Sequence, residues 1–172
     1  MIHGYIRAMD ALQRLCTVVS AVCVVAITLI IPWGIFSRYA LGIGLSWAEP
    51  VSVLLVIWFA FLAAAVCYRE GLHIGVTILP NLLRGRARLA VGWAIELCVA
   101  AINLFMLIWG TRLVETTWGQ LIAALPVVTA GASYLPIPIG GAIVLLFVVE
   151  RLWTGRLFVE PSADTLTHVS TE

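Results

Sequence analysis

Charged side chains are scarce in this sequence: Asp, Glu, Lys and Arg make up only 11% of its 172 residues. Hydrophobic residues make up 62%, and the mean hydropathy is +1.07. So little polar surface cannot enclose a water-soluble core, and the composition therefore predicts an integral membrane protein. It also argues against a nucleic-acid-binding protein, because there is no soluble basic domain to contact phosphates.

Cysteine and histidine are few and are not arranged as ligands. The four Cys residues form no CxxC pair, so we expect neither a disulfide nor a metal site. His3, His73 and His168 lie outside the long apolar runs, which excludes haem held between membrane helices. There is no Gly-rich phosphate loop, no HExxH motif and no nucleophile beside a base, so we expect no enzyme and no cofactor.

Four apolar runs are long enough to cross a bilayer, for which a helix needs about 20 residues. The sequence therefore predicts one all-α membrane domain over residues 1–156, followed by a disordered polar tail at 157–172. The predicted spans cover about 15–36, 50–68, 89–109 and 135–153.

A shorter apolar stretch at 121–132 contains Pro126 and is too short to span. We expect it to be interfacial or re-entrant. A five-span alternative stays open at this stage.

The arginines set the expected orientation, since the chain has no lysine. Only Arg38 and Arg112 fall in the first and third connections between spans. By the positive-inside rule, both termini and the middle loop are therefore cytoplasmic. The eight arginines on that side are Arg7, Arg14, Arg69, Arg84, Arg86, Arg88, Arg151 and Arg156.

The middle loop shows apolar residues at a spacing of four, at Ile74, Ile78 and Leu82. This pattern predicts a short interfacial helix on the inner leaflet. The basic cluster that follows would face phospholipid headgroups, or would serve only as a topology signal. It consists of Arg84, Arg86 and Arg88.

Glu96 is the one acidic residue placed well inside a predicted span, which makes it a functional candidate. Asn103 lies seven residues further on, hence on the same helix face, so the two predict a polar seam against another helix. Structural pairing is favoured over proton or ion coupling, because a single carboxylate without a second buried partner makes a poor relay.

Further polar and aromatic residues mark the second span. Trp58 lies in its middle, where a large ring predicts a packing contact with another helix. Arg38, Trp47 and Glu49 flank its first end, where we expect a local ion pair beside an interfacial Trp, or contact with a partner protein. The other end carries Arg69 and His73.

The order of these motifs resembles the DctQ-type small membrane subunit of tripartite ATP-independent periplasmic (TRAP) transporters. The resemblance rests on Arg38-Tyr39, on Leu45-Ser46-Trp47-Ala48-Glu49, on the apolar helix around Trp58 and on Arg69-Glu70-Gly71-Leu72-His73-Ile74. It continues weakly at Gln120 and at residues 134–140. Pro50 stands where the family often has a second acidic residue.

The resemblance implies a scaffold subunit of a sodium-coupled uptake system for an organic acid in the bacterial inner membrane. Such a subunit pairs with a large polytopic membrane subunit that translocates, and a periplasmic substrate-binding protein delivers the solute. The alternative is a self-sufficient small proton-coupled exporter that uses Glu96.

The predicted topology can be tested with reporter fusions after Gly85 and after Trp118. The positive-inside rule predicts that the first fusion reports the cytoplasm and the second the opposite side. Two fusions that report the same side would contradict the four-span topology.

Overall fold

The computed structural model describes residues 2–71, 86–122 and 125–154. Within these residues four helical segments are long and apolar enough to cross a membrane. The expectation of an all-α membrane protein with four spans is thus confirmed. The long helices are α1 (Ile2–Ala40), α2 (Ala48–Glu70), α4 (Arg86–Thr117) and α6 (Pro136–Thr154).

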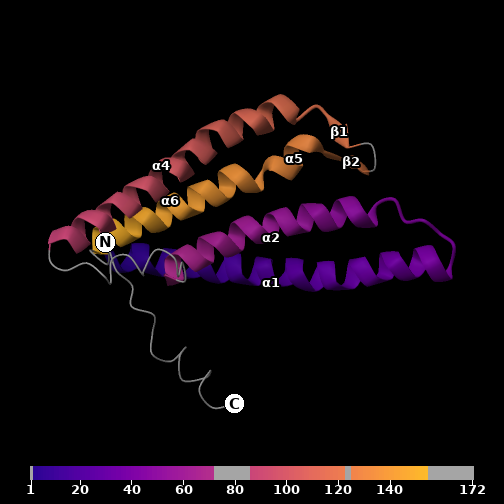
Figure 1. The fold of residues 1–172 in the computed structure, drawn as a ribbon, viewed down its shortest axis with the longest axis horizontal. Coiled ribbons are helices and arrows are strands. Elements are labelled where there is room, and N and C mark those ends of the chain that lie inside the picture. The colour runs from indigo at the N-terminus through magenta and orange to yellow at the C-terminus, as the bar shows by residue number, and fades with distance from the viewer. Residues whose placement is uncertain (1, 72–85, 123–124, 155–172) are drawn as a thin grey trace, which may run out of the picture.

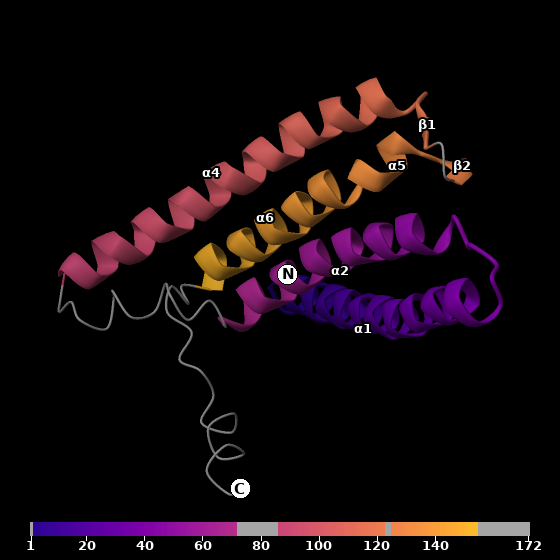
Figure 2. The same cartoon turned by 45° about the vertical axis from the view of Figure 1, so that its right-hand side comes forward.

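The four long helices form two antiparallel hairpins that lie side by side (Figures 1 and 2). α1 packs on α2, α4 packs on α6, and α2 packs on α6, so α2 and α6 occupy the middle of a row. Burial follows this order. The fourth span, Ala130–Trp153, has 44% of its most apolar window buried, whereas the outer span Ala90–Thr117 has 11%.

Each helix contains most or all of its predicted span and runs beyond it. α1 is 39 residues long, or about 58 Å at 1.5 Å per residue, and therefore exceeds the roughly 30 Å hydrocarbon layer. α2 ends where Gly71 adopts a left-handed conformation with φ of 72°, and its N–H bonds to the Tyr68 carbonyl at 3.2 Å. Glycine is the residue that tolerates this C-cap without strain.

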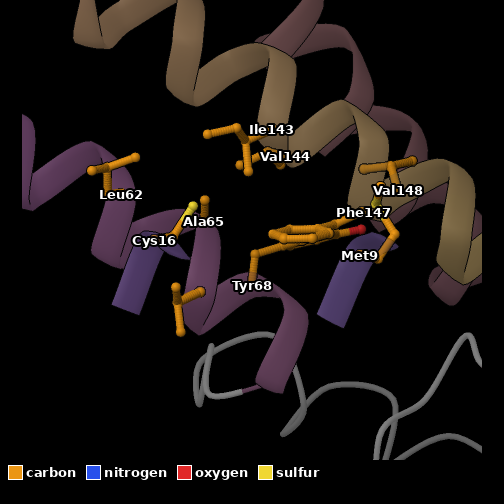
Figure 3. Close-up of a cluster of buried hydrophobic side chains, with 10 residues drawn as sticks. Met9, Cys16, Leu62, Ala65, Tyr68, Ile143, Val144, Phe147 and Val148 are labelled. Carbon is orange, nitrogen blue, oxygen red and sulfur yellow. The ribbon is translucent and has the colours of Figure 1, made fainter. Parts of the chain in front are cut away.

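The buried core lies toward the end of the bundle that holds the N-terminus. Side chains from α1, α2 and α6 point into it (Figure 3). Phe147 of α6 is 1% exposed, and Trp58 packs against the cluster from α2. The buried members are Met9, Cys16, Leu62, Ala65, Val66, Tyr68, Ile143, Val144, Phe147 and Val148.

Two consecutive glycines let α6 approach both neighbours closely. A Cβ added at Gly140 would lie 3.0 Å from the Cβ of Phe61 in α2. A Cβ added at Gly141 would lie 3.0 Å from the carbonyl oxygen of Asn103 in α4. Small residues of this kind allow membrane helices to pack at short distance.

The stretch predicted to be interfacial or re-entrant forms a strand pair at the opposite end of the bundle. Strands β1 (Leu121–Ile122) and β2 (Leu125–Thr129) are antiparallel and lead into the short helix α5 (Ala130–Tyr134). The sequence reasoning did not foresee strands here. Pro126 and the short length of the stretch disfavour a helix here. The strand pair instead provides hydrogen-bond partners for the backbone N–H and C=O groups.

Gly131 of α5 tests how tightly this short helix packs against the end of α4. A Cβ at Gly131 would lie 2.8 Å from the Cα of Trp118. Gly131→Ala should destabilise the protein by about 1 to 3 kcal/mol, since the backbone must move apart. The measurement is thermal unfolding in detergent, monitored by tryptophan fluorescence.

Gly119→Ala is the matched control, because nothing lies within 4 Å of a Cβ there. It should change stability by less than about 0.5 kcal/mol. Equal Tm values for both variants would show that α5 does not pack against the backbone around Trp118 as described.

Candidate functional site

Charged and polar side chains from all four long helices contact one another at the end that holds the N-terminus. We call this cluster the ionic junction. It joins all four long helices through side-chain hydrogen bonds and ion pairs. Its members are Asp10 and Gln13 of α1, Tyr68 and Arg69 of α2, Glu96 of α4, and Glu150 and Arg151 of α6.

Arg69 is the centre of one half of the junction. Its Nε and one terminal nitrogen donate to the two carboxylate oxygens of Glu150, at 2.9 and 2.7 Å. The same terminal nitrogen donates to Asp10 Oδ1 at 2.7 Å, and the other terminal nitrogen donates to Gln13. The two-pronged contact with Glu150 is the strong geometry for a guanidinium and a carboxylate. Arg69 therefore ties α2 to both α6 and α1.

Glu96 is the centre of the other half. Its side chain is 3% exposed, and Arg151 donates to Oε1 at 2.9 Å. The hydroxyl of Tyr68 donates to Oε2. The guanidinium carbon of Arg151 also lies 4.9 Å from the centre of the Tyr68 ring, within reach of a cation–π contact. Both oxygens of the carboxylate thus have a donor, and α4 is tied to α2 and α6.

The two halves are built from adjacent residues. Tyr68 and Arg69 are neighbours in α2, and Glu150 and Arg151 are neighbours in α6. Successive residues of an α-helix point about 100° apart, so Glu150 and Arg151 of α6 contact two different helices, α2 and α4. In α2, Arg69 contacts both neighbours in the row, α1 and α6, and Tyr68 contacts Glu96 of α4.

The structure corrects the expectation that Glu96 lacks a buried partner. Arg151, read from the sequence only as a topology signal, pairs with it. Asn103 does not extend this polar contact to another helix, because its amide donates to the carbonyl of Val99 in its own helix at 2.8 Å. A half-buried amide can satisfy one donor in this way without a second helix.

The sequence singles out Arg69 and Glu96, but it does not reveal Asp10 and Glu150 as the partners of Arg69. The sequence does contain a signal that could have indicated these contacts: a charged residue lies near the same end of each apolar run. Where the packing of the helices buries such a charge, an opposite charge on a neighbouring helix offsets the cost of removing it from water. Which pairs form depends on the helix order, which a single sequence does not contain.

At the opposite end, α1 and α2 enclose an apolar groove of about 610 Å³. Arg38 and Glu49 both line it, while Trp47 precedes α2 and is 40% exposed. The expected ion pair is absent: in the part of the chain that the structure describes, neither Arg38 nor Glu49 takes part in one. Both side chains are exposed, where pairing gains about 0 to 1 kcal/mol and does not offset the cost of ordering them.

Several predicted features fall outside the described residues. These are the interfacial helix, His73, Arg84 and the tail at 157–172. Arg86 and Arg88 lie in the first turn of α4. Among the described residues, no group of three His, Cys, Asp or Glu side chains is placed to hold a metal ion.

Four spanning helices, tied together by their own buried charges, define an all-α multi-pass membrane protein. The chain belongs to the DctQ family, the DctQ component of tripartite ATP-independent periplasmic transporters, whose family profile matches residues 27–157. A protein of Haemophilus influenzae with the provisional name TRAP transporter small permease protein is 29% identical over 158 residues. That alignment covers 87% of this chain and 89% of the relative. The resemblance read from the sequence is confirmed.

The pairing of Glu96 with Arg151 can be tested with a double-mutant cycle. Glu96→Gln should destabilise the protein by about 3 to 5 kcal/mol, because it leaves the half-buried guanidinium of Arg151 without its carboxylate. Arg151→Gln should cost a similar amount, and the double variant should cost less than the sum by about 0.5 to 3 kcal/mol. Unfolding by denaturant in detergent gives each value.

Glu115→Gln is the matched control, since Glu115 lies in the same helix, is exposed and has no partner among the described residues. It should leave stability unchanged within about 0.5 kcal/mol. Additive effects of Glu96→Gln and Arg151→Gln would show that the two side chains do not interact.

Proposed function

We propose that this chain is the small scaffold subunit of a TRAP-type, sodium-coupled uptake system for an organic acid. It pairs with the large polytopic membrane subunit, which carries out translocation, and it does not itself translocate. A periplasmic substrate-binding protein delivers the solute to the assembled pair. Membership of the DctQ family supports this role, as does the name of the Haemophilus influenzae relative.

The observation that carries the proposal is the pairing of the most buried carboxylate. A coupled transporter needs an ionisable group that can exchange a proton or bind an ion during the cycle. Glu96 is 3% exposed and has donors on both carboxylate oxygens. A group held in this way ties helices together and is a poor site for reversible coupling.

Large apolar surfaces on the outer helices support a partner. α1 exposes Leu15, Val22 and Leu29, and α4 exposes Leu97 and Phe105, each by 60% or more. Lipid covers part of this surface, and the large subunit covers the rest. A rigid row of helices with two apolar sides enlarges the fixed part of a transporter against which a moving domain works.

The orientation belongs to the same proposal. We place the ionic junction at the cytoplasmic side and the α1–α2 loop at the periplasmic side of the bacterial inner membrane, with both termini cytoplasmic. The distribution of arginines supports this placement. On this placement the positions of Arg84, Arg86 and Arg88 in the sequence fall on the side of the inner leaflet, whose anionic phospholipid attracts arginine.

Purification of the tagged chain in mild detergent tests the assembly. The scaffold role predicts that a large polytopic protein co-purifies, and that sodium-driven uptake into vesicles requires this chain, the large subunit and the binding protein together. This chain alone should give no transport.

Experiments on the same tagged chain distinguish the scaffold role from the alternative, a self-sufficient proton-coupled exporter. It predicts drug resistance from this chain alone, abolished by Glu96→Gln. Resistance with that dependence, and no co-purifying partner, would refute the scaffold role.

A further inference from the structure

We propose that the groove between α1 and α2 is a binding site for one phospholipid with a zwitterionic, amine-bearing headgroup. One acyl chain lies in the groove, the phosphate contacts Arg38, and the ammonium group contacts Glu49. The inference is argued from residues of this chain alone, and only the comparison with the complex rests on the proposed function.

The shape of the groove fits an acyl chain. Its walls are apolar, with Ile31 and Ile35 from α1 and Val53 and Val56 from α2. Its volume of about 610 Å³ lies within the range of about 300 to 1,000 Å³ that is typical of small-molecule sites. The lining runs from Ile31 to Tyr39 in α1 and from Ala48 to Ile57 in α2, or about 12 to 14 Å along each helix. This length is most of one leaflet of a hydrocarbon core about 30 Å thick.

Small residues bring the two helices together beneath the groove. A Cβ added at Gly34 would lie 3.2 Å from the Cβ of Ala48, so the helices are in close contact there. Ser52 also lines the groove, but its hydroxyl donates to the carbonyl of Ala48 at 2.8 Å. The Ser52 hydroxyl therefore has its partner within its own helix and does not favour water over hydrocarbon in the groove.

The charges at the rim select the headgroup. Arg38 ends α1 and Glu49 lies in the first turn of α2, at the end where each helix meets the polar loop. Both line the groove, both are exposed, and within the described residues neither forms an ion pair. A guanidinium binds a phosphate and a carboxylate binds an ammonium group, so one cation and one anion match a phosphoethanolamine headgroup. An anionic lipid without an amine would leave Glu49 facing its negative charge.

A photoreactive lipid tests this site directly. The full-length chain, alone and in complex with the large subunit, is reconstituted into bilayers that contain phosphatidylethanolamine with a diazirine near the end of one acyl chain. After irradiation, labelled positions are identified by mass spectrometry. Labels should concentrate on Ile31, Ile35, Val53 and Val56, compared with the equally exposed Val22 and Val25 outside the groove.

Variants separate the acyl-chain contact from the headgroup contact. Val53→Trp fills the groove and should reduce its labelling by about fivefold or more, whereas Val25→Trp, on another face of α1, should not. Glu49→Gln should lower labelling by phosphatidylethanolamine about fivefold, and it should raise labelling by phosphatidylglycerol, which no longer faces a carboxylate. Glu49 is exposed, so this second variant tests the site without altering the helix contact.

Three results would overturn the proposal. The first is labelling spread over all exposed faces without response to Val53→Trp. The second is equal labelling of the groove by both lipids in the unmodified protein, which would remove the headgroup assignment. The third is labelling of the groove in the isolated chain that disappears in the complex, which would show that a segment of the large subunit occupies it.

Discussion

The ion pairs at one end of the bundle are the constraint on which the rest of the structure depends. A guanidinium or carboxylate that is buried between apolar helices is costly unless a neighbouring helix supplies the opposite charge. Arg69 meets this requirement with Asp10 and Glu150, and Glu96 meets it with Arg151. Because these contacts link α2 and α6 to each other and to both outer helices, they fix the order of the row.

The two ends of the bundle therefore differ in character. At the ionic junction, side chains of all four helices are bonded to one another and the apolar core lies beside them. At the other end, α1 and α2 form the walls of a groove whose charged rim residues have no ion-pair partners within the described chain. The first arrangement favours rigidity. The second leaves a surface that a lipid can fill, and together they suit a subunit whose proposed role is to hold its shape while a partner moves.

The sequence predicts the fold class well, because the composition and the four apolar runs follow from the thickness of the bilayer. It also singles out Arg69 and Glu96, since ionisable groups in apolar helices are conspicuous. It does not reveal that Glu96 pairs with Arg151, because that contact requires α4 to lie beside α6. The strand pair that follows Gln120 is missed for a similar reason: two short strands depend on each other for hydrogen bonds, and neither carries a pattern long enough to stand out.

The central claim is that the four helices form one static unit during transport. Spin labels at Leu29 of α1 and Ile108 of α4, both exposed, would report the distance between the two hairpins in a chain whose native cysteines are replaced. The measurement is pulsed electron paramagnetic resonance (double electron–electron resonance) on the assembled transporter, with and without sodium and the substrate-loaded binding protein. A static scaffold predicts one narrow distance distribution that is the same in every condition. A shift of several ångströms, or a second population that appears with sodium and substrate, would contradict it.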